Sequence, residues 1–214
     1  LWAMIVDAYQ PACKKDDCSS TENGICKCAA KMRVHAETST FNKTILDANV
    51  NMLRTQTEAM SATIGGVNSL TVLGYDSVFK PTDEFSERIA RNQQLLLKEE
   101  CHFDKVSDPA AGSYYVETLT NEIAAQAWKL FLEVEEQGGF FAAITSGSVQ
   151  QAIKATAATR LKAVSSRREI LLGTNQFPNF NENGAAKVEI TEEVGCDCSH
   201  SGTEKLVPVR GAAQ

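Results

Sequence analysis

Two side chains at the end of a short predicted strand have the chemistry of acids and bases. His35 and Glu37 lie where the predicted strand 32–36 meets the polar loop Glu37-Thr38-Ser39-Thr40. A carboxylate at such a position can act as a general base when it is shielded from water. A histidine can bind a ligand there, although histidines at strand ends more often complete the hydrogen bonding of a core or loop. The sequence identifies no partner for Glu37, so its catalytic role stays an alternative.

Two arginines have the charge needed to contact a phosphate. Arg88 and Arg91 each follow a glutamate by four residues, at Glu84 and Glu87. Pairs of opposite charge at this spacing stabilise the exposed face of a helix. The sequence therefore allows two interpretations of these arginines, a phosphate-binding site and an ion-paired helix face.

The seven cysteines raise the question of a metal site. Cys26-x-Cys28 and Cys196-x-Cys198-x-His200 supply the soft ligands that zinc prefers, but the usual spacing between such ligands is two to four residues. The alternative is that these are free thiols in flexible loops. Because an odd number of cysteines does not fit a secreted disulfide framework, we expect a reducing, cytoplasmic setting.

The composition excludes two classes of partner. A net charge of −6 and a pI near 5.2 disfavour binding to nucleic acid, which usually requires a basic face. No apolar run is long enough to span a bilayer. The 214 residues suffice for one sizeable core. The first residue, Leu1, follows no initiator methionine or basic leader, so we expect the sequence to begin within a longer protein.

Alternating strand and helix patterns predict the α/β class. The clearest helical stretch covers 83–100, where Phe85, Ile89 and Leu96 recur at helical spacing. Thr82 or Asp83 is expected to cap its first turn. The full set of predicted elements comprises a helix over 1–9, strands over 32–36, over 69–73 and from Val106, helices over 48–64, 83–100 and 121–136, a helical region over 140–168 broken near Gly147, and an extended segment over 169–173.

Details of three elements can be predicted from single residues. Asp47 is expected to cap the helix 48–64, and Gly65-Gly66 to end it. The helix 121–136 is expected to bury one apolar stripe, whose members are Ile123, Ala127, Leu130, Phe131 and Val134. A polar, cysteine-rich loop is expected over 13–28. From about Asn181 the composition becomes polar and acidic, which predicts a linker or disordered tail over 181–214.

Several separated motifs resemble the cobalamin-dependent acyl-CoA mutases of the methylmalonyl-CoA mutase family. They are "RVHAETSTF", "RTQTEAMSATIGGVNSLTV", "SERIARNQQLLLKEE", "VSDPAAGSYYVETLT" and "REILLGTNQFPNF", in the order of the family. The resemblance covers roughly 32–180. It implies a partial (β/α)8 TIM-type barrel, with about the last three βα units followed by C-terminal helices. It also divides the chain into a helix with a Cys-rich loop (1–31), the barrel-derived units and following helices (32–180) and the tail (181–214).

The resemblance implies where a substrate would lie. Active sites of (β/α)8 barrels lie at the carboxyl ends of the strands, and in this family the barrel holds an acyl-CoA. The cofactor is adenosylcobalamin, held by a second domain, and the radical chemistry belongs to the cofactor. The substrate-binding positions implied at the barrel mouth are Arg33, His35, Glu37, Thr38, Ser39, Asn68, Asn92 and Gln93.

Departures from the catalytic pattern favour a structural role. Catalytic members resemble "GGTQSLHTN" where this chain has Asn68 and Thr71 in place of the glutamine and histidine. The cobalamin motif Asp-x-His-x-x-Gly is absent from the sequence. The pattern therefore resembles the small, non-catalytic subunit of the heterodimeric bacterial enzymes. We expect no catalytic residue and no metal site on this chain, inactivity in isolation, a catalytic large subunit as partner, and adenosylcobalamin bound by that partner. The alternative is a fragment of a catalytically competent mutase barrel.

Overall fold

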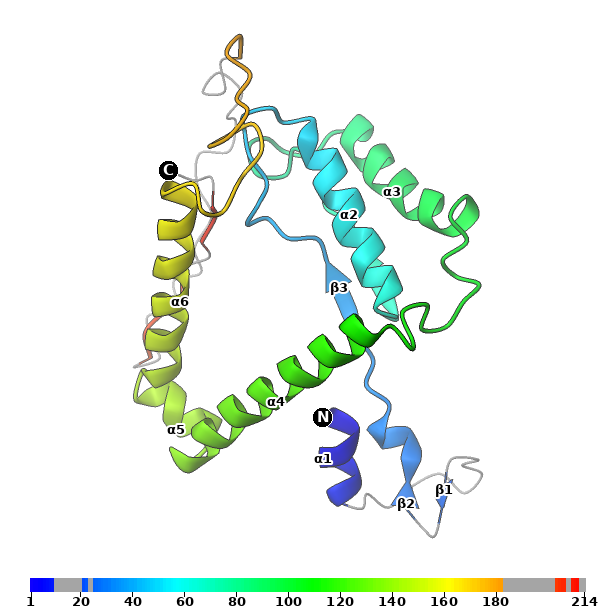
Figure 1. Cartoon of the computed structure of the whole chain (residues 1–214), viewed down its shortest axis with the longest axis vertical. Coiled ribbons are helices and arrows are strands. Elements are labelled where there is room, and N and C mark those ends of the chain that lie inside the picture. Colours follow the sequence, from blue (N-terminus) through cyan, green and yellow to red (C-terminus); the bar gives the residue numbers. More distant parts are fainter. Residues whose placement is uncertain (10–20, 23–24, 183–202, 207–208, 212–214) are drawn as a thin grey trace.

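The computed structural model describes residues 1–9, 21–22, 25–182, 203–206 and 209–211. It is a helix-rich α/β structure in which a long helix joins two groups of elements (Figure 1). The elements in chain order are α1 (Trp2–Ala8), β1 (Thr21–Glu22), β2 (Ile25–Cys26), the 3₁₀ helix η1 (Lys27–Ala30), β3 (His35–Glu37), α2 (Val50–Ile64), β4 (Ser69–Thr71), α3 (Glu84–Glu99), α4 (Tyr114–Glu136), α5 (Phe140–Thr145) and α6 (Ser148–Ser165).

Two parallel strands and two helices form the α/β part. β3 pairs with β4 in the register His35↔Ser69, Ala36↔Leu70 and Glu37↔Thr71. Each strand leads through a loop into a helix, as in a βα unit. Leu70 packs against a small core formed by Ala59 of α2, Val72 after β4, and Ala90 and Leu97 of α3, together with Phe103. The helices therefore lie on one face of the strand pair.

The first turn of α3 follows from its sequence. Asp83 is the N-cap and accepts a hydrogen bond from the backbone N–H of Ser86, whose hydroxyl accepts from the Asp83 N–H. This reciprocal pair satisfies two backbone donors at the helix start. A hydrogen bond from Lys80 Nζ at 2.7 Å, and then the bond from Ser86, lower the pKa of Asp83 to about 2. The predicted cap at Asp83 is confirmed.

Three predictions about a strand, a helix cap and a loop are wrong. No strand forms at Val106, which is exposed in a loop with no neighbouring strand to complete its hydrogen bonds. Asp47 does not cap α2: it has a φ of +48° in a turn, and the N-cap is Asn49. Part of the expected cysteine-rich loop instead contains β1, β2 and η1, while residues 13–20 lie outside the described part of the chain.

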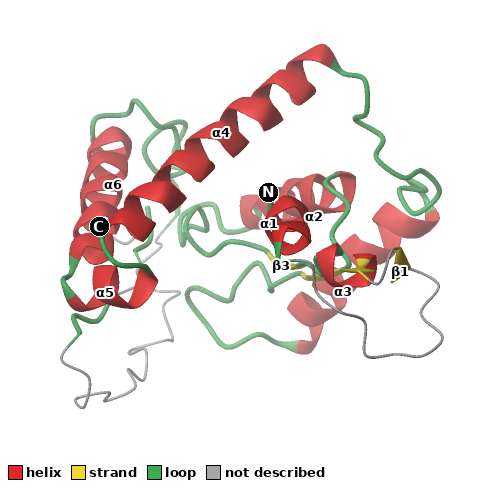
Figure 2. Ribbon diagram, turned by 90° about the horizontal axis from the view of Figure 1, so that it is seen from below, coloured by secondary structure: helices red, strands yellow, loops and turns green. Residues whose placement is uncertain are grey.

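The long helix α4 does not bury the stripe predicted for it. It begins seven residues earlier than expected, at Tyr114, and contains no buried residue. Ile123 is 60% exposed and Leu130 62% exposed. Figure 2 shows the reason: α4 runs as a rod from α5 and α6, and its other end stands clear of α2 and α3, to which a loop connects it. Within the described residues, no layer covers the length of this helix.

Candidate functional site

A row of polar side chains lies on the face of the strand pair that is turned away from the helices. Successive strand residues point to opposite faces. Leu70 points into the core, so the residues on either side of it, Ser69 and Thr71, share the other face with their partners His35 and Glu37. All four are exposed. The strand pair therefore presents four polar side chains side by side, and we call them the polar row.

The imidazole of His35 is held by two hydroxyl groups from the neighbouring strand. Its Nδ1 lies 2.7 Å from Ser69 Oγ, and its Nε2 lies 3.3 Å from Thr71 Oγ1. Both ring nitrogens thus have a hydrogen-bonding partner, which orients the ring. Neither ring nitrogen is left unengaged, as a metal ligand would require, whereas the hydroxyls of Ser69 and Thr71 keep further hydrogen-bonding capacity toward a polar ligand.

The loop after β3 is fastened at the carboxyl end of the strands. Thr38 is buried, its N–H donates to the carbonyl of Thr71 at 3.1 Å, and its Oγ1 accepts from the N–H of Leu73 at 2.9 Å. Glu58 of α2 accepts from the Ser39 N–H at 2.8 Å and from Asn42 Nδ2 at 2.9 Å. The carboxyl ends of β3 and β4 are therefore ordered by the Glu58 side chain of the next helix and by backbone groups of the β4 segment.

Lys43 places a buried amine at the same end. The residue is fully buried, and its Nζ donates to the carbonyls of Leu73 at 3.5 Å and Gly74 at 3.2 Å and to Ser77 Oγ at 3.4 Å. Burial lowers the pKa of Lys43 to about 8, although the charges of Glu58, Asp76 and Glu37 act in the opposite direction. Sequence reasoning missed this lysine, because an isolated lysine in a loop usually lies in solvent.

Asp76 is a second buried charge next to this amine. Its carboxylate is fully buried and lies 3.3 Å from Lys80 Nζ. Neither of its oxygens accepts a hydrogen bond from a described residue. Lys43 and Asp76 thus place two fully buried charged side chains at the carboxyl end of the strand pair.

The structure brings together some of the predicted site residues and separates others. His35, Glu37, Thr38 and Ser39 lie along β3 and its following loop, whereas Arg33 is exposed before the strand. The remaining three lie elsewhere: Asn68, Asn92 and Gln93. Asn68 sits at the amino end of β4, where its Oδ1 accepts from the Val34 N–H at 2.8 Å, and Asn92 is exposed on α3.

Gln93 holds α3 against α2. Its Nε2 donates to the carbonyl of Met52 at 2.6 Å and lies 2.9 Å from Thr55 Oγ1. It is thus part of the helix packing, on the opposite side of the strand pair from the polar row. The substrate-binding positions expected from the resemblance did not include Ser69, Thr71 or Lys43, although Thr71 was already noted as a departure from the catalytic pattern.

We expect the Gln93→Ala substitution to lower the free energy of unfolding by about 1 kcal/mol, because it removes two interhelical hydrogen bonds. Gln94→Ala, on the same helix, is the matched control and should have a smaller effect, since no hydrogen bond joins its side chain to α2. Urea unfolding of the two variants measures the difference. Equal stability in both would show that Gln93 does not fasten the helices.

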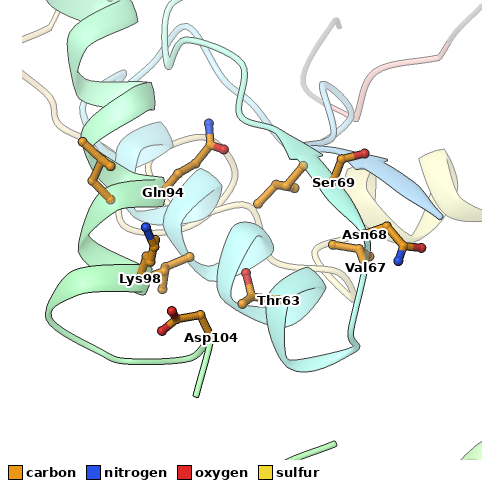
Figure 3. A pocket seen from close by; sticks show the side chains of 10 residues that line it. Thr63, Val67, Asn68, Ser69, Gln94, Lys98 and Asp104 are labelled. Atoms are coloured by element: carbon orange, nitrogen blue, oxygen red, sulfur yellow. The ribbon is translucent and has the colours of Figure 1, made fainter. Parts of the chain in front are cut away.

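A pocket of about 370 Å³ lies at the other end of the strand pair (Figure 3). It is enclosed by the last turn of α2, the start of β4 and the second half of α3, with Thr63, Asn68, Lys98 and Asp104 among its lining residues. Only Asn68 belongs to the predicted site. Ser69 also lines it, so the pocket reaches the amino end of the polar row but does not include the row's carboxyl end or Lys43.

The cysteine clusters are only partly covered by the structure. Cys28 is exposed, and the cluster Cys196, Cys198 and His200 lies outside the described residues. Where the chain is described, His, Cys, Asp and Glu side chains form no group of three or more able to hold a metal ion. In the same part of the chain, no helix has the length and apolar character required to cross a bilayer.

Fold and site together define a class of protein: an α/β protein whose parallel strands carry helices on one face and a polar row on the other. The sequence model of the methylmalonyl-CoA mutase family matches residues 20–210. This match covers most of the chain, which therefore belongs to the methylmalonyl-CoA mutase family.

Individual relatives agree with this assignment. The chain is 54% identical to the methylmalonyl-CoA mutase small subunit of Porphyromonas gingivalis over 215 residues, which cover 100% of this chain and 33% of the relative. It is 45% identical to the methylmalonyl-CoA mutase small subunit of Streptomyces virginiae over 72% of this chain and 25% of the relative. It is 35% identical to the mitochondrial methylmalonyl-CoA mutase of Mus musculus over 89% of this chain and 24% of the relative. The chain thus spans about a third or less of the length of these relatives.

Proposed function

We propose that this chain is part of the small subunit of a methylmalonyl-CoA mutase and acts mainly as a structural partner of the catalytic large subunit. The holoenzyme would interconvert methylmalonyl-CoA and succinyl-CoA by adenosylcobalamin radical chemistry in the cytoplasm. The observation that carries the proposal is the 54% identity, over the whole chain, to a protein named as a small subunit. The two consecutive units β3–α2 and β4–α3 would then belong to a (β/α)8 barrel.

The side chains at the two departures from the catalytic pattern support a structural role. Asn68 has its Oδ1 engaged by the backbone of Val34, and Thr71 has its hydroxyl near the ring of His35. Both groups therefore complete contacts within the strand pair. The polar row remains open to an acyl-CoA, and we propose His35, Glu37 and Ser69 as the side chains that such a ligand would meet.

The described histidines do not fit a cobalt ligand. His35 has both ring nitrogens next to hydroxyl groups, and His102 lies exposed in a turn with a φ of +56°. We therefore assign adenosylcobalamin to the partner subunit and derive no step of the reaction from this chain.

The runner-up is a catalytically competent mutase barrel with altered mouth residues. The 35% identity to the mouse mitochondrial enzyme, whose name specifies no small subunit, is the observation in its favour. The two functions differ in which subunit binds the cofactor.

Co-purification with the large subunit, followed by adenosylcobalamin titration, tests the proposal. We expect the chain to elute with the large subunit, and the cobalamin absorbance to follow only the large subunit when each is titrated alone. The large subunit without the chain is the control. If the chain alone takes up one equivalent of cobalamin, the structural role is wrong and the catalytic alternative replaces it.

A further inference from the structure

The described part of the C-terminal segment, residues 203–206 and 209–211, returns to the loops at the candidate site. Glu204 forms an ion pair with Lys154 of α6. Leu206 and Val209 then line an apolar groove of about 660 Å³ together with Phe41 and side chains of α4 and α6. We call these described residues the C-terminal strap.

Arg210 of the strap connects the two loops that follow β3 and β4. Its Nη2 donates to the carbonyl of Lys43 at 3.2 Å, and its Nη1 donates to the carbonyl of Val78 at 3.3 Å. The first carbonyl belongs to the loop between β3 and α2, and the second to the loop between β4 and α3. A planar guanidinium can hold two acceptors at once in a fixed geometry, which the single ammonium of a lysine does not reproduce.

The next residue fits closely against the same loop. The N–H of Gly211 donates to the carbonyl of Phe41 at 2.9 Å, and Gly211 is buried. A Cβ added to Gly211 would lie 3.1 Å from two atoms of the Phe41 ring and 3.3 Å from Leu171 Cδ1. Arg160 of α6 lies over that ring, 3.8 Å from its centroid. Phe41 is therefore held by both the strap and α6.

Lys43 is fastened from two sides by this arrangement. Its ammonium reaches the backbone of the β4–α3 loop at Leu73 and Gly74, while its carbonyl receives Arg210. The two cations thus bridge the same pair of loops, one from inside and one from the strap. Loss of the outer bridge would leave the carbonyls of Lys43 and Val78 without the donors that Arg210 provides, and would favour local opening.

We propose that Arg210 is a positioning residue, which clamps the two loops at the carboxyl ends of β3 and β4 and keeps Lys43 buried there. The proposal concerns the shape of the candidate site and does not depend on the mutase function.

Reductive methylation of the full chain with formaldehyde and cyanoborohydride, read by residue-resolved mass spectrometry, tests the clamp. At a pH above the ordinary lysine pKa, where the amine is neutral in both proteins, we expect Lys43 to react about tenfold faster in Arg210→Ala than in the unmodified sequence, because local opening exposes it. The midpoint of its rate against pH should also move upward from about 8 toward the ordinary lysine value. Arg91→Ala, on the exposed face of α3, is the matched control and should leave both quantities unchanged.

Two milder variants keep the proposal falsifiable if Arg210→Ala unfolds and all lysines become reactive together. Arg210→Lys retains the positive charge but not the planar guanidinium that donates to two carbonyls, and Gly211→Ala places a methyl group against Phe41. Both should increase the reactivity of Lys43 relative to Lys98, which is exposed on α3. Two results would contradict the proposed clamp. In the first, Lys43 reacts as slowly in Arg210→Ala as in Arg91→Ala. In the second, Lys43 reacts as slowly in both milder variants as in the unmodified sequence.

Discussion

Replacing Asn51 with alanine is expected to lower the free energy of unfolding by about 3–5 kcal/mol, a large share of the stability of an ordinary domain. Asn51 is fully buried in the first turn of α2. Its Oδ1 accepts from the Thr44 N–H at 3.1 Å, and its Nδ2 donates to the carbonyls of Thr44 at 2.8 Å and Tyr75 at 3.0 Å. Truncation removes the partners of three backbone groups that are shielded from water. Urea denaturation measures the change.

The exposed Asn92→Ala substitution is the matched control for Asn51→Ala. It removes the same amide from α3 and replaces asparagine with a better helix former, so its effect should be within about 0.5 kcal/mol. Asn51→Asp is a stricter variant, because it keeps the acceptor but replaces the donor to Thr44 and Tyr75 with an oxygen. A small effect of both Asn51 variants would contradict the view that this side chain joins the two loops to α2.

Helices with local signals were predictable from the sequence. The bounds of α3 lie within one residue of the predicted 83–100, because apolar spacing, the Asp83 cap and the adjacent acidic residues act within the helix itself. The end of α2 at Gly65 and the break before α6 at Gly147 are confirmed for the same reason. Gly147 has a φ of +80°, a conformation that glycine adopts without strain.

Elements that depend on distant neighbours were predicted less well. Val106 was expected to begin a strand, but a strand requires a second strand at hydrogen-bonding distance, and none is adjacent among the described residues. The apolar stripe of α4 has the right spacing for burial, yet Ile123 and Leu130 stay exposed. Periodicity shows which face of a helix is able to pack; it does not show what covers that face.

The candidate site was predictable in its strand and unpredictable in its buried charges. The sequence predicted a strand ending at Ala36 with Glu37 in the loop after it; the observed β3 includes Glu37, and its register with β4 puts His35, Glu37, Ser69 and Thr71 on one face. Lys43 gave no comparable signal, since its acceptors are about thirty positions away in the sequence. Its burial arises where two loops meet.

The buried amine of Lys43 should make the free energy of unfolding of the whole chain depend on pH. Below about pH 8 the amine is protonated in both the folded and the unfolded states, and burying its charge destabilises the folded state. Between about pH 8 and the ordinary lysine pKa, the unfolded state keeps the proton that the folded state has lost. Stability rises with pH wherever the unfolded state binds more protons. Lys43 should therefore make the chain more stable as the pH increases through this window.

We expect the free energy of unfolding of the unmodified sequence, relative to Lys43→Met, to increase by about 2 kcal/mol from pH 7 to pH 10, less than the full pKa shift implies because this range covers only part of the titration. The difference between the two proteins cancels the titration of the other groups. Lys98→Met removes an exposed lysine of α3 and should give a difference that does not change with pH. If urea denaturation shows that the difference in free energy of unfolding between the unmodified sequence and Lys43→Met also does not change with pH, Lys43 is solvated in solution.

Arg210 and Lys43 bridge the same loops. When Arg210→Ala opens the clamp, we therefore expect the contribution of Lys43 to the free energy of unfolding to become independent of pH. The pH profile thus distinguishes a buried amine held by the strap from one that packing alone would bury.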